Sequence, residues 1–241
     1  NSVNFKISLW NPETNGMRYL KMLSYNLASS LTDSQKKIVS NTKNRNVGNP
    51  ITISFDEEMC LDYIQSSLEV DYILKNLKPS SILEIGAGYG RTCHTIVSNC
   101  EVSDYTIIDL PECLDISKKY LSSVLTNDAF KRICFVEADD YRSVLNKKFD
   151  LGLNIDSFAE MNSKCVQNYL SLINEVCNFF YVKNPVGKYM EASLDNHPEG
   201  IAVVEKALSS GLLTDIVKIH DKNQVKISSK KFLSVYSPGV E

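Results

Sequence analysis

The sequence predicts an α/β fold: a mostly parallel sheet with an α-helical extension before it and an antiparallel hairpin at its end. Three observations support this prediction. From residue 81 onward, short apolar runs typical of buried strands alternate with amphipathic stretches typical of helices. The first strand, 81–86, leads directly into a glycine-rich turn and then a helix. Glycines follow the first predicted strand and polar side chains lie at the ends of the other four, at the carboxyl ends where ligands bind in open α/β sheets.

The composition is that of an ordinary globular protein of one or two domains. The 241 residues are 43% hydrophobic and 23% charged, with a formal net charge of −3. This acidic balance argues against a nucleic-acid partner, because binding phosphates needs a basic surface. No run of 18 apolar residues is present, so no membrane-spanning helix is expected. The seven cysteines lack paired short spacings, which indicates free thiols and a reducing, cytoplasmic setting.

Residues 1–77 are predicted to form the helical extension. Leucines recur at helical spacing before residue 32, and Thr32 and Gln35 then form a capping box for a second helix. We expect the extension to cover, as a lid, the site of the acceptor, which is the molecule that the protein would act on. Otherwise it should make a contact between copies of the chain.

A third helix is predicted over residues 55–77, after a polar loop at 40–50. Ser54 and Glu57 have the spacing of a capping box, which would open this helix. The apolar positions change phase near Ser66, so a kink or a break into two helices is expected there.

The rest of the chain, 78–241, is predicted to form the sheet domain. Its five strands are expected at 81–86, 105–109, 133–137, 149–156 and 179–183. The chain should close with a helix at 198–209 and strands at 214–220 and 231–236, joined by a polar turn as an antiparallel hairpin.

The glycine turn is the first candidate binding element. Gly86, Gly88 and Gly90 alternate, with Ala87 between the first two, so the backbone can approach a ligand closely. The spacing Gly-x-Gly-x-Gly differs from the Gly-x-Gly-x-x-Gly pattern of dinucleotide folds. A sulfonium cofactor carries no phosphate, and its positive charge favours acidic neighbours. Glu84, two residues before the first glycine, is expected to point into the pocket.

Further cofactor contacts are expected at the ends of the next strands. Asp109 ends the second strand and could accept both hydroxyl hydrogens of a ribose, with Leu110 beside it. Asp139 and Asp140 follow the third strand, and we favour Asp139 for an adenine amino group and Asp140 for a helix cap. Asn154, on the fourth strand, could hold the amino-acid tail of such a sulfonium cofactor, or it could hold the acceptor.

Three segments carry a resemblance to a known family: Glu-Ile-Gly-Ala-Gly-Tyr-Gly-Arg at 84–91, Ile-Asp-Leu-Pro-Glu at 108–112, and Asn-Ile-Asp-Ser-Phe-Ala-Glu-Met at 154–161. With the strand order, they make residues 78–241 resemble a class I S-adenosylmethionine-dependent methyltransferase, which has a Rossmann-like sheet. More narrowly, they resemble a bacterial family described as sugar O-methyltransferases. The resemblance implies S-adenosylmethionine as cofactor, S-adenosylhomocysteine (SAH) as product, and a small-molecule or glycan acceptor.

Methyl transfer to a hydroxyl needs a group that removes its proton. The candidates for this catalytic base are, in order of preference, Glu160, His197 and Asp156. His94, just past the glycine turn, is more simply explained as a solvated helix residue. Asp156 and Glu160 alone do not form a convincing metal site, so no metal is expected.

Three alternatives remain at this point. The first is a methyltransferase that acts on an amine or a small secondary metabolite. The second is a nicotinamide-dependent oxidoreductase with the same strand, turn and helix, which the glycine spacing disfavours. The third is a non-catalytic protein that kept the fold as a scaffold.

Overall fold

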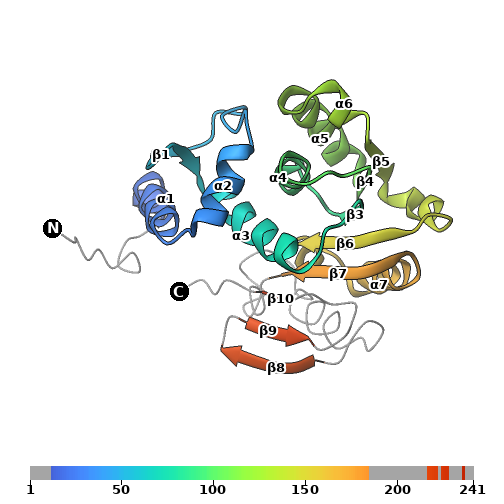
Figure 1. Ribbon diagram of the computed structural model, residues 1–241. Helices are drawn as coiled ribbons and strands as arrows, with labels where there is room; N and C mark the ends of the chain where they lie inside the picture. The colour runs from blue at the N-terminus through green and yellow to red at the C-terminus, as the bar shows by residue number, and fades with distance from the viewer. Residues whose placement is uncertain (1–11, 185–215, 222–223, 228–234, 237–241) are drawn as a thin grey trace.

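The computed structural model describes residues 12–184, 216–221, 224–227 and 235–236. Its centre is a five-stranded parallel sheet with the strand order β5-β4-β3-β6-β7 (Figure 1). The strands are β3 (Ser81–Ile85), β4 (Asp104–Asp109), β5 (Ile133–Glu137), β6 (Phe149–Ile155) and β7 (Cys177–Lys183). The chain moves outward from β3 to β5 and then returns to β6 on the other side of β3. The strand order therefore reverses beside β3, where ligands bind in folds of this kind.

Helices cover both faces of this sheet (Figure 1). Those of the sheet domain are α4 (Arg91–Asn99), α5 (Pro111–Val124), α6 (Asn127–Phe130) and α7 (Ser163–Val176), with short 3-10 turns η2 (Ala138–Val144) and η3 (Phe158–Glu160). Neighbouring side chains of β3 point to opposite faces. Ile82 packs in a core cluster with α4 and α5, whereas Leu83 packs in a second cluster with α7. Both strand faces are buried, as the continuous apolar runs predicted.

The extension begins with α1 (Pro12–Ser29) and α2 (Asp33–Asn41). The capping box of α2 is confirmed: the backbone N–H of Gln35 donates to the Thr32 hydroxyl, and the Gln35 side chain accepts from the Thr32 N–H. Together these two bonds satisfy donors that the start of a helix leaves without partners.

The capping box predicted at Ser54 is wrong. Ser54 ends strand β1 (Thr52–Ser54), which pairs antiparallel with β2 (Glu58–Cys60). The Glu57 carboxylate does not cap a helix, because it accepts a hydrogen bond from Ser40 and forms a 2.5 Å ion pair with Arg45. The third helix therefore starts at residue 61 rather than 55.

That helix, α3 (Leu61–Asn76), is continuous, so the predicted kink near Ser66 is also wrong. The Ser66 hydroxyl donates to Thr95 Oγ1 at 2.9 Å, which connects α3 to α4. Val70 and Ile73 of α3 are fully buried in the same cluster as Ile82 of the sheet. The extension and the sheet domain thus share a hydrophobic core.

Antiparallel strands close the described chain, as predicted, but they form a sheet of their own in which the two predicted strands each pair with a strand between them and not with each other. This sheet has the order β10-β9-β8 and contains β8 (Ile216–Asp221), β9 (Gln224–Ile227) and β10 (Val235–Tyr236). The predicted polar turn is wrong, because β9 lies inside it. The helix predicted at 198–209 lies outside the described residues.

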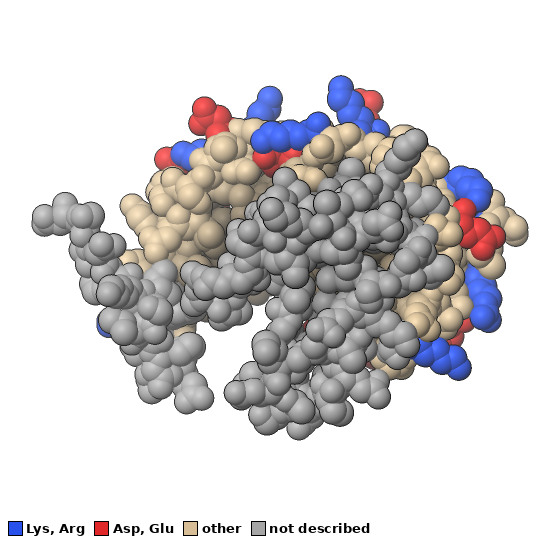
Figure 2. All heavy atoms as spheres, turned by 90° about the horizontal axis from the view of Figure 1, so that it is seen from below, with Lys and Arg blue, Asp and Glu red and all other residues tan. Residues whose placement is uncertain are grey.

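Charged side chains of both signs lie together on the described surface. On the face shown in Figure 2, Lys and Arg residues alternate with Asp and Glu residues along the rim. None of the described helices is both long and apolar enough to cross a membrane.

Candidate active site

All three glycines of the turn after β3 have positive φ, and the space around them differs. Gly86 has φ +73°, and a Cβ there would lie 2.1 Å from the Oγ of Ser157. Gly88 has φ +57° and open space around its Cα, so its backbone faces the cavity directly. Gly90, with φ +96°, opens α4, and a Cβ there would meet Leu121.

The turn rests on a hydrogen-bonded support from the end of β6. The Asn154 side-chain amide donates to the Ile85 carbonyl at 3.0 Å and to Ser157 Oγ at 2.6 Å. Its carbonyl oxygen accepts from the Phe158 N–H and from the Asn184 amide, the latter at 2.9 Å. Asn154 is therefore fully buried and satisfied beneath the turn.

Asp109 connects the turn to the next strand. Its Oδ2 accepts from the Gly88 N–H at 2.9 Å, and its Oδ1 accepts from the Leu110 N–H at 2.8 Å. These bonds fix the carboxylate at the carboxyl end of β4, facing the space above the turn.

A cavity of about 720 Å³ lies above these groups. This volume is within the range of small-molecule and cofactor sites. The described residues lining it come from the ends of β3, β4, β5 and β6 and from α5 and α7: Gly86, Gly88, Ile108, Asp109, Leu110, Cys113, Ala138, Asp139, Tyr141, Ser157, Glu160, Met161, Asn162, Cys165, Asn168 and Tyr169. Tyr141 and Tyr169 meet edge to face, with ring centroids 5.5 Å apart, and give one wall an aromatic surface.

Neither a protein-family model nor a curated protein matches the sequence. Solved structures do match. A protein from Klebsiella pneumoniae described as an O-methyltransferase aligns with a TM-score of 0.53 at 12% identity, over 84% of this chain and 90% of its own. The O-methyltransferase from Bacillus cereus, in complex with SAH, aligns with a TM-score of 0.52 at 12% identity, over 83% of this chain and 91% of its own. The chain has a Rossmann-like methyltransferase fold.

Within this methyltransferase fold, the predicted cofactor residues divide into two groups. Gly86, Gly88, Asp109, Leu110 and Asp139 line the cavity. The others lie outside its described lining: Glu84, Ala87, Gly90, Asp140 and Asn154.

Glu84 lies inside the domain rather than in the cavity lining. Its carboxylate is buried and accepts a 2.8 Å hydrogen bond from the Tyr105 hydroxyl. Burial raises the pKa of Glu84 to about 7, and the bond from Tyr105 offsets part of this rise. A buried acid on β3 is thus explained by its pairing with β4.

The three candidate bases lie in different places. Glu160 lines the cavity. Asp156 follows β6 in a left-handed conformation (φ +63°), and half of its side chain is exposed. His197 lies outside the described residues.

His94 is buried, so the expectation of a solvated histidine is wrong. Its Nδ1 lies 2.6 Å from the Tyr63 hydroxyl, and its ring meets those of Tyr63 and Tyr120 edge to face. Burial and the nearby charge of Arg45 lower the pKa of His94 to about 4, which keeps the imidazole neutral at neutral pH.

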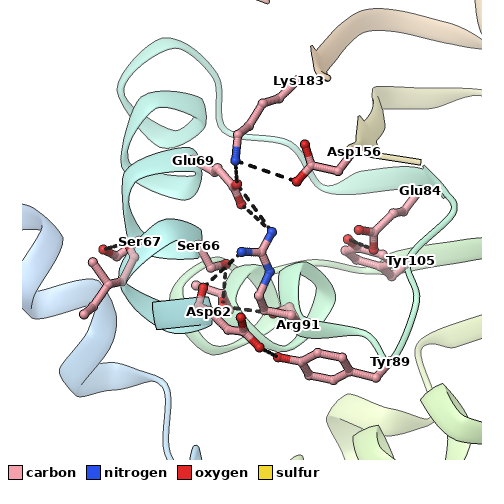
Figure 3. Close-up of polar contacts among 12 residues, drawn as sticks. Asp62, Ser66, Ser67, Glu69, Glu84, Tyr89, Arg91, Tyr105, Asp156 and Lys183 are labelled. Atoms are coloured by element: carbon pink, nitrogen blue, oxygen red, sulfur yellow. Dashed lines mark hydrogen bonds and ion pairs between the residues drawn. The ribbon is translucent and has the colours of Figure 1, made fainter. Parts of the chain in front are cut away.

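A cluster of charged residues that the sequence did not predict lies at the ends of β6 and β7 (Figure 3). Glu69, from α3, pairs with Arg91 at 3.1 Å and with Lys183 at 2.6 Å. Lys183 Nζ also lies 4.0 Å from Asp156 Oδ2. The alternation of strands and helices could have placed Lys183 at the carboxyl end of β7, where ligands bind. No pattern in the sequence indicated that Glu69 would lie beside it.

Within the described ranges, no three His, Cys, Asp or Glu side chains gather in a metal-binding arrangement.

Proposed function

We propose that the chain is an S-adenosylmethionine-dependent methyltransferase that methylates an oxygen of a sugar or glycan precursor. The observation that supports this most is the cavity lined by Gly86, Gly88 and Asp109, which lies beside β3 where the strand order reverses. The fold that forms this cavity is shared with O-methyltransferases. One of those relatives is complexed with SAH. The sugar acceptor rests on the resemblance of residues 84–91, 108–112 and 154–161.

The residues that line the cavity fit an adenosyl cofactor. Gly88 offers a backbone without a side chain, and Asp109 offers a carboxylate of the right type for ribose hydroxyls. Asp139 offers a hydrogen-bond acceptor for the amino group of a purine base, and Tyr141 and Tyr169 offer an aromatic wall for its ring. The cofactor, when bound, supplies a methyl group activated by its sulfonium. The remaining tasks of the chain are to hold the acceptor hydroxyl in line and to take its proton.

Titration calorimetry with SAH and with NAD tests the cofactor class. We expect SAH to bind the wild type and NAD to show no binding. Asp109→Ala should weaken SAH binding at least about tenfold, because it removes one or two charge-assisted hydrogen bonds to the ribose. The variant should fold like the wild type. Binding of NAD alone would contradict the proposal, and unchanged SAH affinity in the variant would remove the ribose role of Asp109.

A transfer assay with radiolabelled S-adenosylmethionine tests the acceptor class. One panel contains nucleotide-activated sugars and the other contains primary and secondary amines of similar size. Label in the sugar panel supports O-methylation of a sugar. Label in the amine panel alone favours the alternative acceptor, and label in neither panel with intact SAH binding favours the non-catalytic scaffold.

A further inference from the structure

The charged cluster at the ends of β6 and β7 connects the extension to the edge of the sheet where an acceptor would lie. Glu69 and Lys183 are almost fully buried, with 3% and 4% of their side chains exposed. Arg91, the first residue of α4, donates to the Asp62 carbonyl as well as to Glu69. Figure 3 shows Glu69 between the two cations, with Asp156 beside the Lys183 ammonium group.

Asp156 is the member of this cluster that reaches the surface. Its side chain is 51% exposed, and its Oδ2 lies 4.0 Å from Lys183 Nζ. Its backbone N–H donates to the Lys183 carbonyl at 2.7 Å. Lys183 therefore contacts Asp156 through both its main chain and its ammonium group. The backbone of Asp156 is left-handed (φ +63°), a conformation that aspartate and asparagine adopt more readily than other residues with a side chain.

Glu160 lies in a different environment. It lines the cavity together with Asp109 and Cys113, and its charge interacts with the Cys113 thiol at the start of α5. Asp109, which offers a carboxylate suited to the ribose, lines the same cavity. Asp156, at the junction of β6 and β7, lies outside the described cavity lining and beside the buried ammonium group of Lys183. The two carboxylates therefore differ in what surrounds them, and Asp156 is better placed for an acceptor over the second half of the sheet.

We infer that Asp156 takes the proton of the acceptor hydroxyl and that Lys183, held by Glu69, is the residue that positions it. This inference rests on the proposed methyl transfer. The hydroxyl proton moves to the Asp156 carboxylate, the acceptor oxygen bonds to the methyl carbon, and the carbon–sulfur bond breaks with its electron pair staying on sulfur. Glu69 thus makes the N-terminal extension part of the active site.

Nitrogen-15 NMR of the lysine ammonium groups tests the coupling without any acceptor. The Lys183 signal is identified as the one missing in Lys183→Arg. We expect Asp156→Asn to move this signal, because it removes the neighbouring charge. The matched control is Asp104→Asn, whose partner is Lys147 at 3.3 Å at the opposite edge of the sheet. An Asp156→Asn spectrum in which the Lys183 signal does not move would overturn the inference.

Kinetics with the sugar acceptor found in the transfer assay give the second readout. Lys183→Met should lower kcat about 10- to 100-fold through misplacement of Asp156, with SAH affinity within about twofold of wild type. Lys183→Arg should restore part of the rate, and circular dichroism checks that each variant folds. Lys147→Met, the matched surface lysine, should leave kcat and KM unchanged. A Lys183→Met variant with wild-type kcat would refute the positioning role.

The two hypotheses fail in different ways. Absence of SAH binding removes the proposed function whatever the NMR spectra show. SAH binding and methyl transfer with wild-type kcat in Asp156→Asn removes the inference and leaves the proposed function standing, with Glu160→Gln as the next variant to measure.

Discussion

Gly86 and Gly88 both have positive φ, yet an added methyl group would meet different surroundings at the two positions. At Gly86 it would overlap the Ser157 side chain, whereas at Gly88 it would find open space. We expect Gly86→Ala to lower the free energy of unfolding by about 2–4 kcal/mol, from backbone strain and overpacking. Gly88→Ala should cost only the strain, about 1–2 kcal/mol. Urea denaturation of both variants measures the difference, and equal losses would mean that Ser157 moves aside freely.

Glu84 gives the stability of the protein a dependence on pH. Its pKa is raised from 4.5 to about 7 in the folded state, so the folded state binds the proton more tightly than the unfolded state. The stabilisation from this proton is fully present below about pH 4.5 and is lost as pH rises through about 7. Relative to Glu84→Gln, the wild type should therefore lose up to about 3 kcal/mol of unfolding free energy across that range. Denaturation curves at several pH values test this, and a constant difference would show that Glu84 is ionised throughout.

Among the elements, α2 depends on its N-terminal cap. Thr32→Ala removes the oxygen that accepts from the Gln35 N–H and should destabilise the protein by about 1 kcal/mol. Thr32→Ser keeps the hydroxyl and serves as the control, with an expected loss of a few tenths of a kcal/mol. Thermal denaturation of the two variants compares them, and equal melting temperatures would mean that the cap contributes little.

The elements also show where sequence patterns are reliable. The five parallel strands were predicted within about two residues at either end, because a buried strand is a short apolar run bounded by turns. The capping box at Ser54 failed because its pattern needs only two residues, while the partners of Glu57 lie 12 and 17 residues away. The residues at the strand ends could be predicted for the same reason as the strands. The pairing of Glu69 with Lys183 could not, since it depends on how α3 packs.

At the scale of the whole molecule, the extension and the sheet should unfold together. Ile73 of α3 is fully buried in the same core cluster as Ile82 and Ile96 of the sheet domain. Ile73→Ala should lower the free energy of unfolding by about 2–5 kcal/mol and keep a single transition. Tyrosine fluorescence and far-ultraviolet circular dichroism should therefore give the same midpoint. Two separate midpoints would mean that residues 1–77 form an independent domain.

Glu69 also sets an order of events while the chain is being made. Arg91 follows it by 22 residues, whereas Lys183 follows it by 114. As synthesis proceeds from the N-terminus, Arg91 can neutralise the carboxylate long before β7 exists. Lys183 joins only when the last parallel strand is in place, because closing so long a loop is slow. The ion pair between Glu69 and Lys183 is therefore a marker of the completed parallel sheet, formed at the same moment as the edge that carries Asp156.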